Sequence, residues 1–431
     1  NFAIILGVFR DYFREVDMFG IGNKPSVLGG TMIIAGTAIG AGMLALPTIS
    51  AGMWIWWSLA LMVLTWLMML FSSQAILEVN LNYKPGASFH TLVRDNLGKF
   101  WNLVNGLSVA FVLYILLYAY VSGGGSMVVH TFNAVFGYEP PKILSGLLFA
   151  LFLSGCVWWS TYLVDRFSVI MIGGMVITFV FAMSGMLGEI KSAFILDVQN
   201  DGSSYGIFVF VALSTYLTSF CFHASVPSLV KYFGKDPLSI NKCLVYGTLI
   251  ALFAYIIWIV ACDGNIMRSD FKSVIAAGGN VSDLIEAASS NLNGSFLLRM
   301  LDAFAFLAVA TSFLGAGLGL FDYMADLCGF DDSRLGRTKT MLVTFAPPIV
   351  AGMIYPDGFL LAIGWAGLAA TIWSVIIPAL LLRAARQRND KQVQNYRVWG
   401  GNFTIYGLLV FGCVVGICHI LFVFELLPMY Q

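Results

Sequence analysis

Long apolar segments separated by short polar stretches recur along almost the whole chain. A helix of about 20 apolar residues crosses the hydrocarbon core of a bilayer. The pattern therefore predicts an all-α integral membrane protein with eleven transmembrane helices. The predicted spans are Ser26–Ala51, Trp54–Val79, Trp101–Val121, Lys142–Trp159, Phe167–Leu187, Tyr205–Tyr232, Asn241–Ala261, Phe296–Leu320, Thr338–Ile354, Phe359–Leu382 and Phe403–Phe424.

The composition excludes a water-soluble globular protein. Of the 431 residues 59% are hydrophobic and 11% are charged, whereas soluble domains carry about 25% charged residues. The formal charge is zero, with 23 basic and 23 acidic residues, which argues against nucleic acid as a partner. The seven cysteines lack metal-type spacing, so we expect neither a disulfide framework nor a metal cluster.

The basic residues predict the orientation, because cytoplasmic loops are enriched in Lys and Arg. With a cytoplasmic N-terminus, most of the 23 basic residues fall inside. The exceptions are Lys142, Lys191, Arg268, Lys272 and Arg299. We therefore expect a cytoplasmic N-terminus and a periplasmic C-terminus in a bacterial inner membrane. Residues 1–24 read as a cytoplasmic amphipathic segment on the membrane surface rather than a cleaved signal.

Two spans contain residues that weaken a helix at mid-membrane depth. The first span reads GTAIGAGM at Gly36–Met43 before Pro47, and the sixth reads SFCFHAS at Ser219–Ser225 before Pro227. A single glycine-rich helix is more often a packing face. Two interruptions five helices apart instead predict inverted five-helix repeats of a transporter. The predicted division is residues 25–187, then 188–383, then a loop and eleventh helix at 384–431.

A broken helix exposes main-chain N–H groups at one end and carbonyl groups at the other. A zwitterionic amino acid fits, with its carboxylate on N–H groups near Ala41 and Gly42 and its ammonium on carbonyls near Phe220. The alternatives are ordinary core packing for the phenylalanines and a backbone-holding role for His223. The residues predicted to contact substrate in the two breaks are Thr37, Gly40, Ala41, Gly42, Ser219, Phe220, Phe222 and His223.

Several motifs resemble the bacterial tryptophan and tyrosine permeases, within the hydroxy and aromatic amino acid permeases of the leucine-transporter fold superfamily. They are GTAIGAGMLALP (Gly36–Pro47), LEVNLNY (Leu77–Tyr83), FVLYILLYAYVSGGGS (Phe111–Ser126), SFCFHASVPSL (Ser219–Leu229), ATSFLGAGLGLFDYMADL (Ala310–Leu327) and TFAPP (Thr344–Pro348). The resemblance implies secondary active uptake of an aromatic L-amino acid, with no organic cofactor, no enzymatic activity and no obligatory protein partner. It also implies that a hydroxyl of Tyr114 or Tyr118 meets the substrate carboxylate, helix packing being the alternative.

The coupling cation is predicted from the eighth span. The fold places a common sodium site between the first and eighth helices. Five neutral oxygens suit Na⁺, the alternative being hydroxyls bonded back to their own helix. The residues predicted to supply these oxygens are Gly36, Ile39, Ala308, Thr311 and Ser312.

Four positions depart from the pattern that the resemblance implies. Met175 stands where a lysine is expected and Phe306 where a polar residue is expected, so we favour Na⁺ over H⁺, with both left open. Cys221 and Ala224 stand where glycines are expected, which leaves tryptophan versus tyrosine open, with tryptophan ahead. A transporter-like sensor, a channel and an integral-membrane enzyme are the rival functions.

Overall fold

The computed structural model describes residues 25–198, 202, 204–292, 294–388 and 396–430. The predicted amphipathic segment at residues 1–24 lies outside them. Every regular element in the described part of the chain is a helix, which confirms the all-α prediction.

Two pairs of short helices lie at the predicted interruptions, and the remaining elements are mostly long. The first nine elements are α2 (Val27–Ala38), η1 (Ala41–Ala45), α3 (Leu46–Ser50), α4 (Trp54–Asn80), α5 (Phe89–Phe136), α6 (Lys142–Trp159), α7 (Thr161–Gly188), α8 (Ser192–Ile195) and η2 (Gly206–Phe208). The others are α9 (Val209–Ser219), α10 (Ser225–Phe233), α11 (Pro237–Asn265), η3 (Arg268–Asp270), α12 (Phe271–Ala276), α13 (Val281–Ser289), α14 (Ser295–Cys328), α15 (Arg334–Ile354), α16 (Phe359–Thr371), η4 (Ile372–Ile376), α17 (Ile377–Gln387) and α18 (Asn402–Val423).

Eight described helices are long and apolar enough to cross a membrane, or nine if the bent pair at the first span counts as one. Two of the eleven predicted spans do not meet this criterion of length and hydropathy. One is α15, which begins with Arg334, Arg337 and Lys339, and the other is the short pair α9 and α10. All eleven predicted spans coincide with helical elements, but the number of crossings stays a prediction. The protein is a multi-pass membrane protein.

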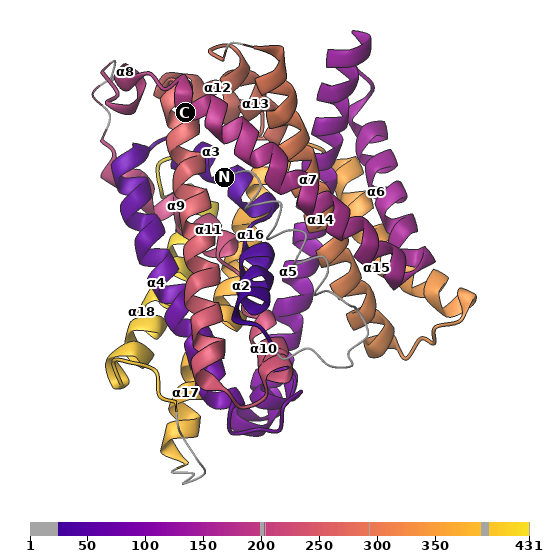
Figure 1. The fold of residues 1–431 in the computed structure, drawn as a ribbon, viewed down its shortest axis with the longest axis vertical. Coiled ribbons are helices and arrows are strands. Elements are labelled where there is room, and N and C mark those ends of the chain that lie inside the picture. Colours follow the sequence, from indigo (N-terminus) through magenta and orange to yellow (C-terminus); the bar gives the residue numbers. More distant parts are fainter. Residues whose placement is uncertain (1–24, 199–201, 203, 293, 389–395, 431) are drawn as a thin grey trace.

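The helices form an elongated bundle with two distinct ends (Figure 1). Helices α3, α12 and α13 lie at one end, called here the α13 end, and α10 and α17 lie at the other, the α17 end. Helix α14 packs against α7 and α5, α16 against α5 and α9, and α11 against α2. The interrupted elements α2 and α9 therefore lie against long continuous helices.

One glycine sets the closest helix approach beside the second interruption. A Cβ atom on Gly367 of α16 would lie 1.9 Å from the carbonyl oxygen of Ser214 on α9. Only a residue without a side chain permits this approach. The hydroxyl of Thr218 then reaches the carbonyl of Ile363 on α16 at 3.0 Å. This contact fixes the last turn of α9 to α16, directly before the second interruption.

Helical segments outside the predicted spans are added by the structure. The helix of the third span runs on through three consecutive glycines to Phe136, and it begins before the span, at Phe89. Its two parts meet at a bend where Gly98 has a φ of 86°, a left-handed conformation that suits glycine. Helix α13 begins with a capping box between Asn280 and Asp283.

Candidate functional site

The first predicted interruption is a true break in the helix. Helix α2 ends at Ala38, and Gly40 has an extended backbone with φ −160° and ψ −162°. The chain then continues through η1 and α3, with a bend of 45° between the two parts. A Cβ atom on Gly40 would lie 2.7 Å from the hydroxyl oxygen of Ser312, so α14 approaches the backbone directly at this point.

The second predicted interruption is also a true break. Helix α9 ends at Ser219, and α10 begins at Ser225 after a non-helical stretch. Phe220, Phe222 and His223 in this stretch are almost completely buried. Both breaks thus occur at the first and sixth predicted spans, as the glycine and proline pattern predicted.

Tyr255 on α11 links the two breaks. Its hydroxyl lies 2.6 Å from the carbonyl oxygen of Ala38, at the end of α2, and 2.6 Å from that of Ser219, at the end of α9. A phenol has one proton, so it donates to one carbonyl at a time. The ring of Phe220 also contacts the Tyr255 ring, with centroids 4.9 Å apart. Sequence reasoning missed Tyr255, because it is one aromatic residue in a uniformly apolar helix.

Two serines join the breaks to each other and to α14. The hydroxyl of Ser219 donates to the carbonyl of Gly42 at 3.0 Å. The main-chain N–H of Ala41 donates to the hydroxyl oxygen of Ser312 at 2.9 Å. On the α17 side of the breaks the hydroxyls of Thr37 and Ser225 are 3.2 Å apart. The predicted residues of the first and second breaks are therefore brought together.

The second break faces a π-helical turn, η4, in the tenth predicted span. The His223 ring meets the Trp373 ring of η4 nearly edge-on, with centroids 6.1 Å apart. Both ring nitrogens of His223 and the indole nitrogen of Trp373 are buried and make no hydrogen bond of normal geometry within the described residues. The main chain of Met69 also lies near the His223 ring. Because buried polar atoms normally have partners, these nitrogens are candidates for binding a ligand. A π-turn is frequent at functional sites.

The tyrosines of the third span point in different directions. The hydroxyl of Tyr114 donates to the carbonyl of Val343 on α15, and that of Tyr118 donates to the carbonyl of Tyr355. Both hydroxyls are thus engaged at α15 or just beyond it. Tyr120 is the tyrosine of α5 that lies next to Ser312 and Cys221. The spacing that places Tyr114 and Tyr118 on one face could not show that Tyr120 faces the breaks.

The five residues predicted to hold Na⁺ lie on α2 and its C-terminal cap and on α14. Ser312 binds the first break directly, as described above. The hydroxyl of Thr311 donates to the carbonyls of Leu307 at 2.8 Å and Ala308 at 3.2 Å, so it is bonded back to its own helix. Gly36 lies in the last turn of α2, and Ile39 is its C-cap. Their role as cation ligands stays a prediction.

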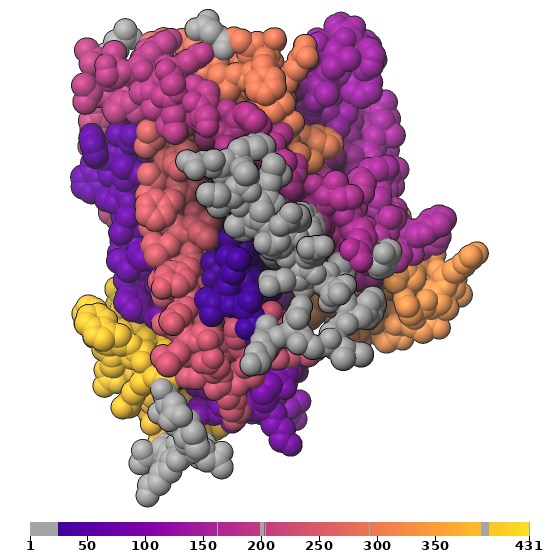
Figure 2. Space-filling view, in the orientation of Figure 1, coloured from indigo at the N-terminus to yellow at the C-terminus, as the bar shows by residue number. Residues whose placement is uncertain are grey.

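Exposure differs on the two sides of the breaks. On the α17 side, Gly36 and Thr37 of α2 and Ala224 before α10 are exposed. On the α13 side, η1 and α9 are largely buried, and Ala45 is 1% exposed. Figure 2 shows part of α2, in indigo, reaching the surface beside α11. The segments on the α13 side of the breaks are therefore more deeply buried than those on the α17 side.

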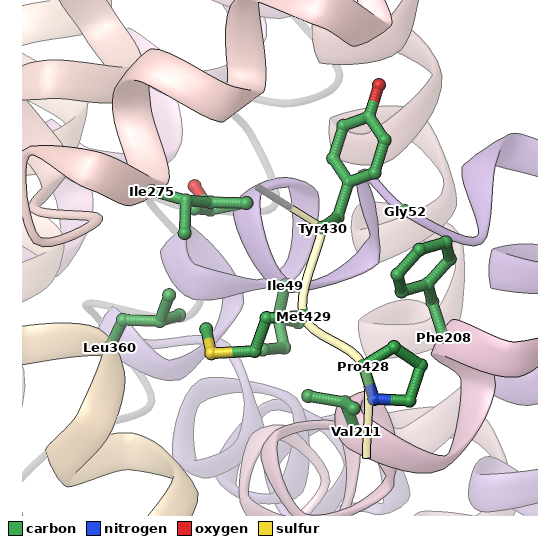
Figure 3. A pocket seen from close by; sticks show the side chains of 10 residues that line it. Ile49, Gly52, Phe208, Val211, Ile275, Leu360, Pro428, Met429 and Tyr430 are labelled. Atoms are coloured by element: carbon green, nitrogen blue, oxygen red, sulfur yellow. The ribbon is translucent and has the colours of Figure 1, made fainter. Parts of the chain in front are cut away.

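A shallow apolar pocket lies at the α13 end, away from both breaks (Figure 3). The pocket is lined by Ile49 of α3, Phe208 before α9 and the C-terminal residues Met429 and Tyr430. The Tyr430 ring meets the Phe208 ring edge-on and lies 4.6 Å from the Arg268 guanidinium. The C-terminal segment thus covers part of the α13 end.

A buried ion pair holds the opposite end together. Both carboxylate oxygens of Glu78, at the end of α4, accept hydrogen bonds of 2.8 Å from Arg386 on α17. The main-chain N–H of Val398 donates to the same carboxylate at 2.6 Å. Glu78 is 1% exposed in this pair and Arg386 is 9% exposed. The pair is buried rather than solvated.

Comparisons with known proteins complete the description. The model of the tryptophan/tyrosine permease family matches residues 23–419. A tryptophan-specific transport protein of Pseudomonas aeruginosa (strain UCBPP-PA14) is 51% identical over 409 residues, covering 95% of this chain and 98% of that protein. A tyrosine permease of Enterobacter agglomerans is 40% identical over 413 residues, covering 95% of this chain and 99% of that protein.

A solved structure shares the fold. The crystal structure of the Eremococcus coleocola manganese transporter in complex with an aromatic bis-isothiourea substituted compound matches with a TM-score of 0.59. The match covers 96% of this chain and 91% of that chain at 13% identity. At this identity the likeness concerns the fold alone.

Proposed function

Because the chain belongs to the tryptophan/tyrosine permease family, we propose that it is a cation-driven symporter that imports tryptophan in preference to tyrosine. Aromatic amino-acid transport follows from the family, and the protein is not an enzyme. The import direction, the bacterial inner membrane and the coupling ion belong to the proposal. The observation that carries it is the meeting of two helix breaks at one hydroxyl, that of Tyr255.

The breaks suit the two charged ends of an amino acid. Their carbonyl groups carry partial negative charge at the ends of α2 and α9, where the substrate ammonium would bind. The start of η1 carries partial positive charge, where the carboxylate would bind. The Ala41 N–H already donates to Ser312, so a carboxylate there shares this serine or displaces it. The tyrosine hydroxyl that binds the substrate carboxylate is then that of Tyr120, rather than that of Tyr114 or Tyr118.

His223 gives a physical reason for a preference for tryptophan. A neutral imidazole has one acceptor nitrogen, and an indole has one N–H donor. His223 is 1% exposed, and neither ring nitrogen has a partner of normal geometry in the described chain. An indole N–H bound there would satisfy the acceptor nitrogen. The rings of Phe222 and Trp373 beside His223 offer apolar surface for the aromatic side chain.

Na⁺ binding between α2 and α14 is the proposed driving step. Ser312 already connects α14 to the start of η1, so a cation there would tighten the contact between α14 and the first break. Ser and Thr hydroxyls and main-chain carbonyls are the oxygen ligands that hard cations prefer. H⁺ coupling is the alternative. Na⁺ is favoured because Met175 stands where the family resemblance implies a lysine, and Phe306 stands where it implies a polar residue.

The α17 end is assigned to the cytoplasm and the α13 end to the outside. With this assignment the exposed residues Gly36, Thr37 and Ala224 face the inside, and the described conformation is open inward. Movement of the half-helices η1, α3 and α9 would then open the opposite side. This is the alternating access expected of repeat-built transporters.

Uptake of radiolabelled tryptophan into proteoliposomes tests the proposal. With an inward Na⁺ gradient, constant pH and an uncoupler present, we expect accumulation above the external concentration. Replacement of Na⁺ by choline should abolish accumulation, and equal uptake in choline would refute sodium coupling. A sensor would bind tryptophan without accumulating it, and a channel would equilibrate it without concentrating it.

A further inference from the structure

One carboxyl group outside the proposed substrate site has no partner. Asp263 lies in the last turn of α11 and is 1% exposed. Both of its carboxylate oxygens are buried and make no hydrogen bond within the described chain. An ionised carboxylate in such a place is strongly disfavoured, because burial removes it from bulk solvent and no cation of the described chain pairs with it. The site as it stands accommodates the neutral, protonated acid.

The groups around Asp263 do not neutralise it. Tyr216, on α9, lies close enough to interact with the carboxyl group and is itself fully buried. The thiol of Cys262 is the other titratable neighbour. The two nearby cations are engaged elsewhere, since the Arg268 guanidinium contacts Asp197 at 3.2 Å and the Lys191 ammonium contacts Asn291 at 2.8 Å.

The hydroxyl of Tyr216 also lies near two serines. Ser50 belongs to α3 and Ser58 to α4, and their hydroxyls already donate to the carbonyls of Leu46 and Trp54. The proton of each serine is therefore used within its own helix, and the neutral Tyr216 phenol brings no positive charge to the carboxylate. The elements packed on this part of α11 supply no positive charge for Asp263.

The position of Asp263 connects it to the elements that must move. Helices α3 and α9 are the half-helices on the α13 side of the two breaks; α3 packs on α11, and Tyr216 of α9 lies near Asp263. Tyr255, which joins the breaks, lies eight residues earlier in the same helix. That separation is about 12 Å along an α-helix. Asp263 thus lies between the covered end of the molecule and the breaks.

We propose that Asp263 is a proton-binding site that controls closure of the outer side. When α3 and α9 move away, water reaches the carboxyl group, which loses its proton to that water. When the half-helices return, the carboxylate first takes a proton from the outer solution, because its ionised form cannot be buried unpaired. The proton leaves and returns on the same side, so it is not transported with the substrate. External acid therefore favours closure.

This inference rests on the proposed transport function and adds pH control to it. The test measures initial tryptophan uptake in proteoliposomes at a constant Na⁺ gradient and constant internal pH. Between an external pH of about 8 and about 6, we expect the wild-type rate to rise several-fold, because closure requires a bound proton. Asp263→Asn imitates the neutral acid, and we expect its uptake to be independent of external pH and as fast as the wild type in acid.

The control is Asp270→Asn, a carboxyl group outside the proposed machinery at the same end of the molecule, which should keep the wild-type pH response. The same response in Asp263→Asn, or a wild-type rate that does not vary with external pH, would overturn the inference. Failure of the wild type to accumulate tryptophan at any pH would instead refute the proposed function.

A second measurement covers the case in which Asp263→Asn does not fold. Asp263→Glu keeps a titratable group and should keep the pH response of uptake. Infrared spectra of the wild type at neutral pH should show a protonated carboxyl band, and this band should shift in Asp263→Glu. A wild-type spectrum without a protonated carboxyl band, or a band unchanged in Asp263→Glu, would contradict the inference.

Discussion

The hydroxyl oxygen of Tyr255 lies 2.6 Å from the carbonyl oxygen of Ala38, the last residue of α2 before the first break. The same hydroxyl lies 2.6 Å from the carbonyl oxygen of Ser219, where the second broken helix ends. One side chain on the continuous helix α11 therefore holds both breaks in a fixed relation. The two helix ends at which we propose that the substrate ammonium binds are thus positioned by a residue on another helix.

Tyr255→Phe removes this link and keeps the ring. A buried carbonyl that loses its donor costs about 1–3 kcal/mol. We expect tryptophan uptake to fall about tenfold, since 1.4 kcal/mol corresponds to a factor of ten. Tyr246→Phe on the same helix, where the side chain is exposed, is the matched control and should transport normally. Normal uptake by well-folded Tyr255→Phe would show that the link is dispensable.

Ser312→Ala tests the contact between α14 and the first break. The substitution leaves the Ala41 N–H without its acceptor and removes a proposed cation ligand. We expect the Na⁺ concentration for half-maximal uptake to rise about tenfold, the effect of about 1.4 kcal/mol. Ser184→Ala is the control, because that hydroxyl only bonds back to Val180 of its own helix. An unchanged Na⁺ requirement would argue against a cation site at Ser312.

The fold and the two breaks were predictable from the sequence because their causes are local. Apolar length predicts spans, and Gly36, Gly40, Gly42 and Pro47 weaken one helix wherever it packs. The family resemblance was equally local, since it depended on short continuous motifs. These features need no knowledge of which helices are neighbours.

The contacts of the site were less predictable, because they depend on helix rotation and packing. Tyr114, Tyr118 and Tyr120 differ by at most six positions, yet the first two hydroxyls reach the main chain at and just after α15 and the third lies near Ser312. Hydropathy carries no information about such directions. Tyr255 gave no signal at all, because nothing in its own helix marks the carbonyl groups that it meets.

Glu78→Gln should destabilise the α17 end. Removing one charge of a buried pair leaves the other uncompensated, at a cost of about 3–5 kcal/mol. We expect the melting temperature in detergent to fall by about 5 °C or more, measured by differential scanning fluorimetry. Asp95→Asn breaks the exposed pair with Arg94 and should change stability little. A Glu78→Gln protein as stable as the control would show that the buried pair contributes nothing net.

Cysteine labelling tests which end is open. In a background with all seven native cysteines replaced by serine, Thr37→Cys and Ala224→Cys should react with a membrane-impermeant thiol reagent applied from the cytoplasmic side. Ala45→Cys, at a position that is 1% exposed, should not react. Saturating tryptophan with Na⁺ should slow the labelling of Thr37→Cys, because an occupied site shields that residue. Reaction of Ala45→Cys from the outside, with Thr37→Cys inert, would reverse the assigned conformation.

The preference for tryptophan is tested at His223, whose ring nitrogens lack partners of normal geometry in the described chain. If a ring nitrogen of His223 accepts the indole N–H of tryptophan, the benzothiophene analogue of tryptophan should bind less well, because sulfur replaces the N–H. We expect this analogue to compete for uptake about five- to tenfold less well than tryptophan. That ratio reflects one neutral hydrogen bond of about 1 kcal/mol. His223→Leu should lower tryptophan affinity to that of the analogue and leave the analogue unchanged. His419→Leu is the control, because His419 is already bonded to Ser214 at 2.9 Å. Equal losses for tryptophan and its analogue in His223→Leu would make His223 a structural residue, and the preference would then arise from the shape of the aromatic pocket.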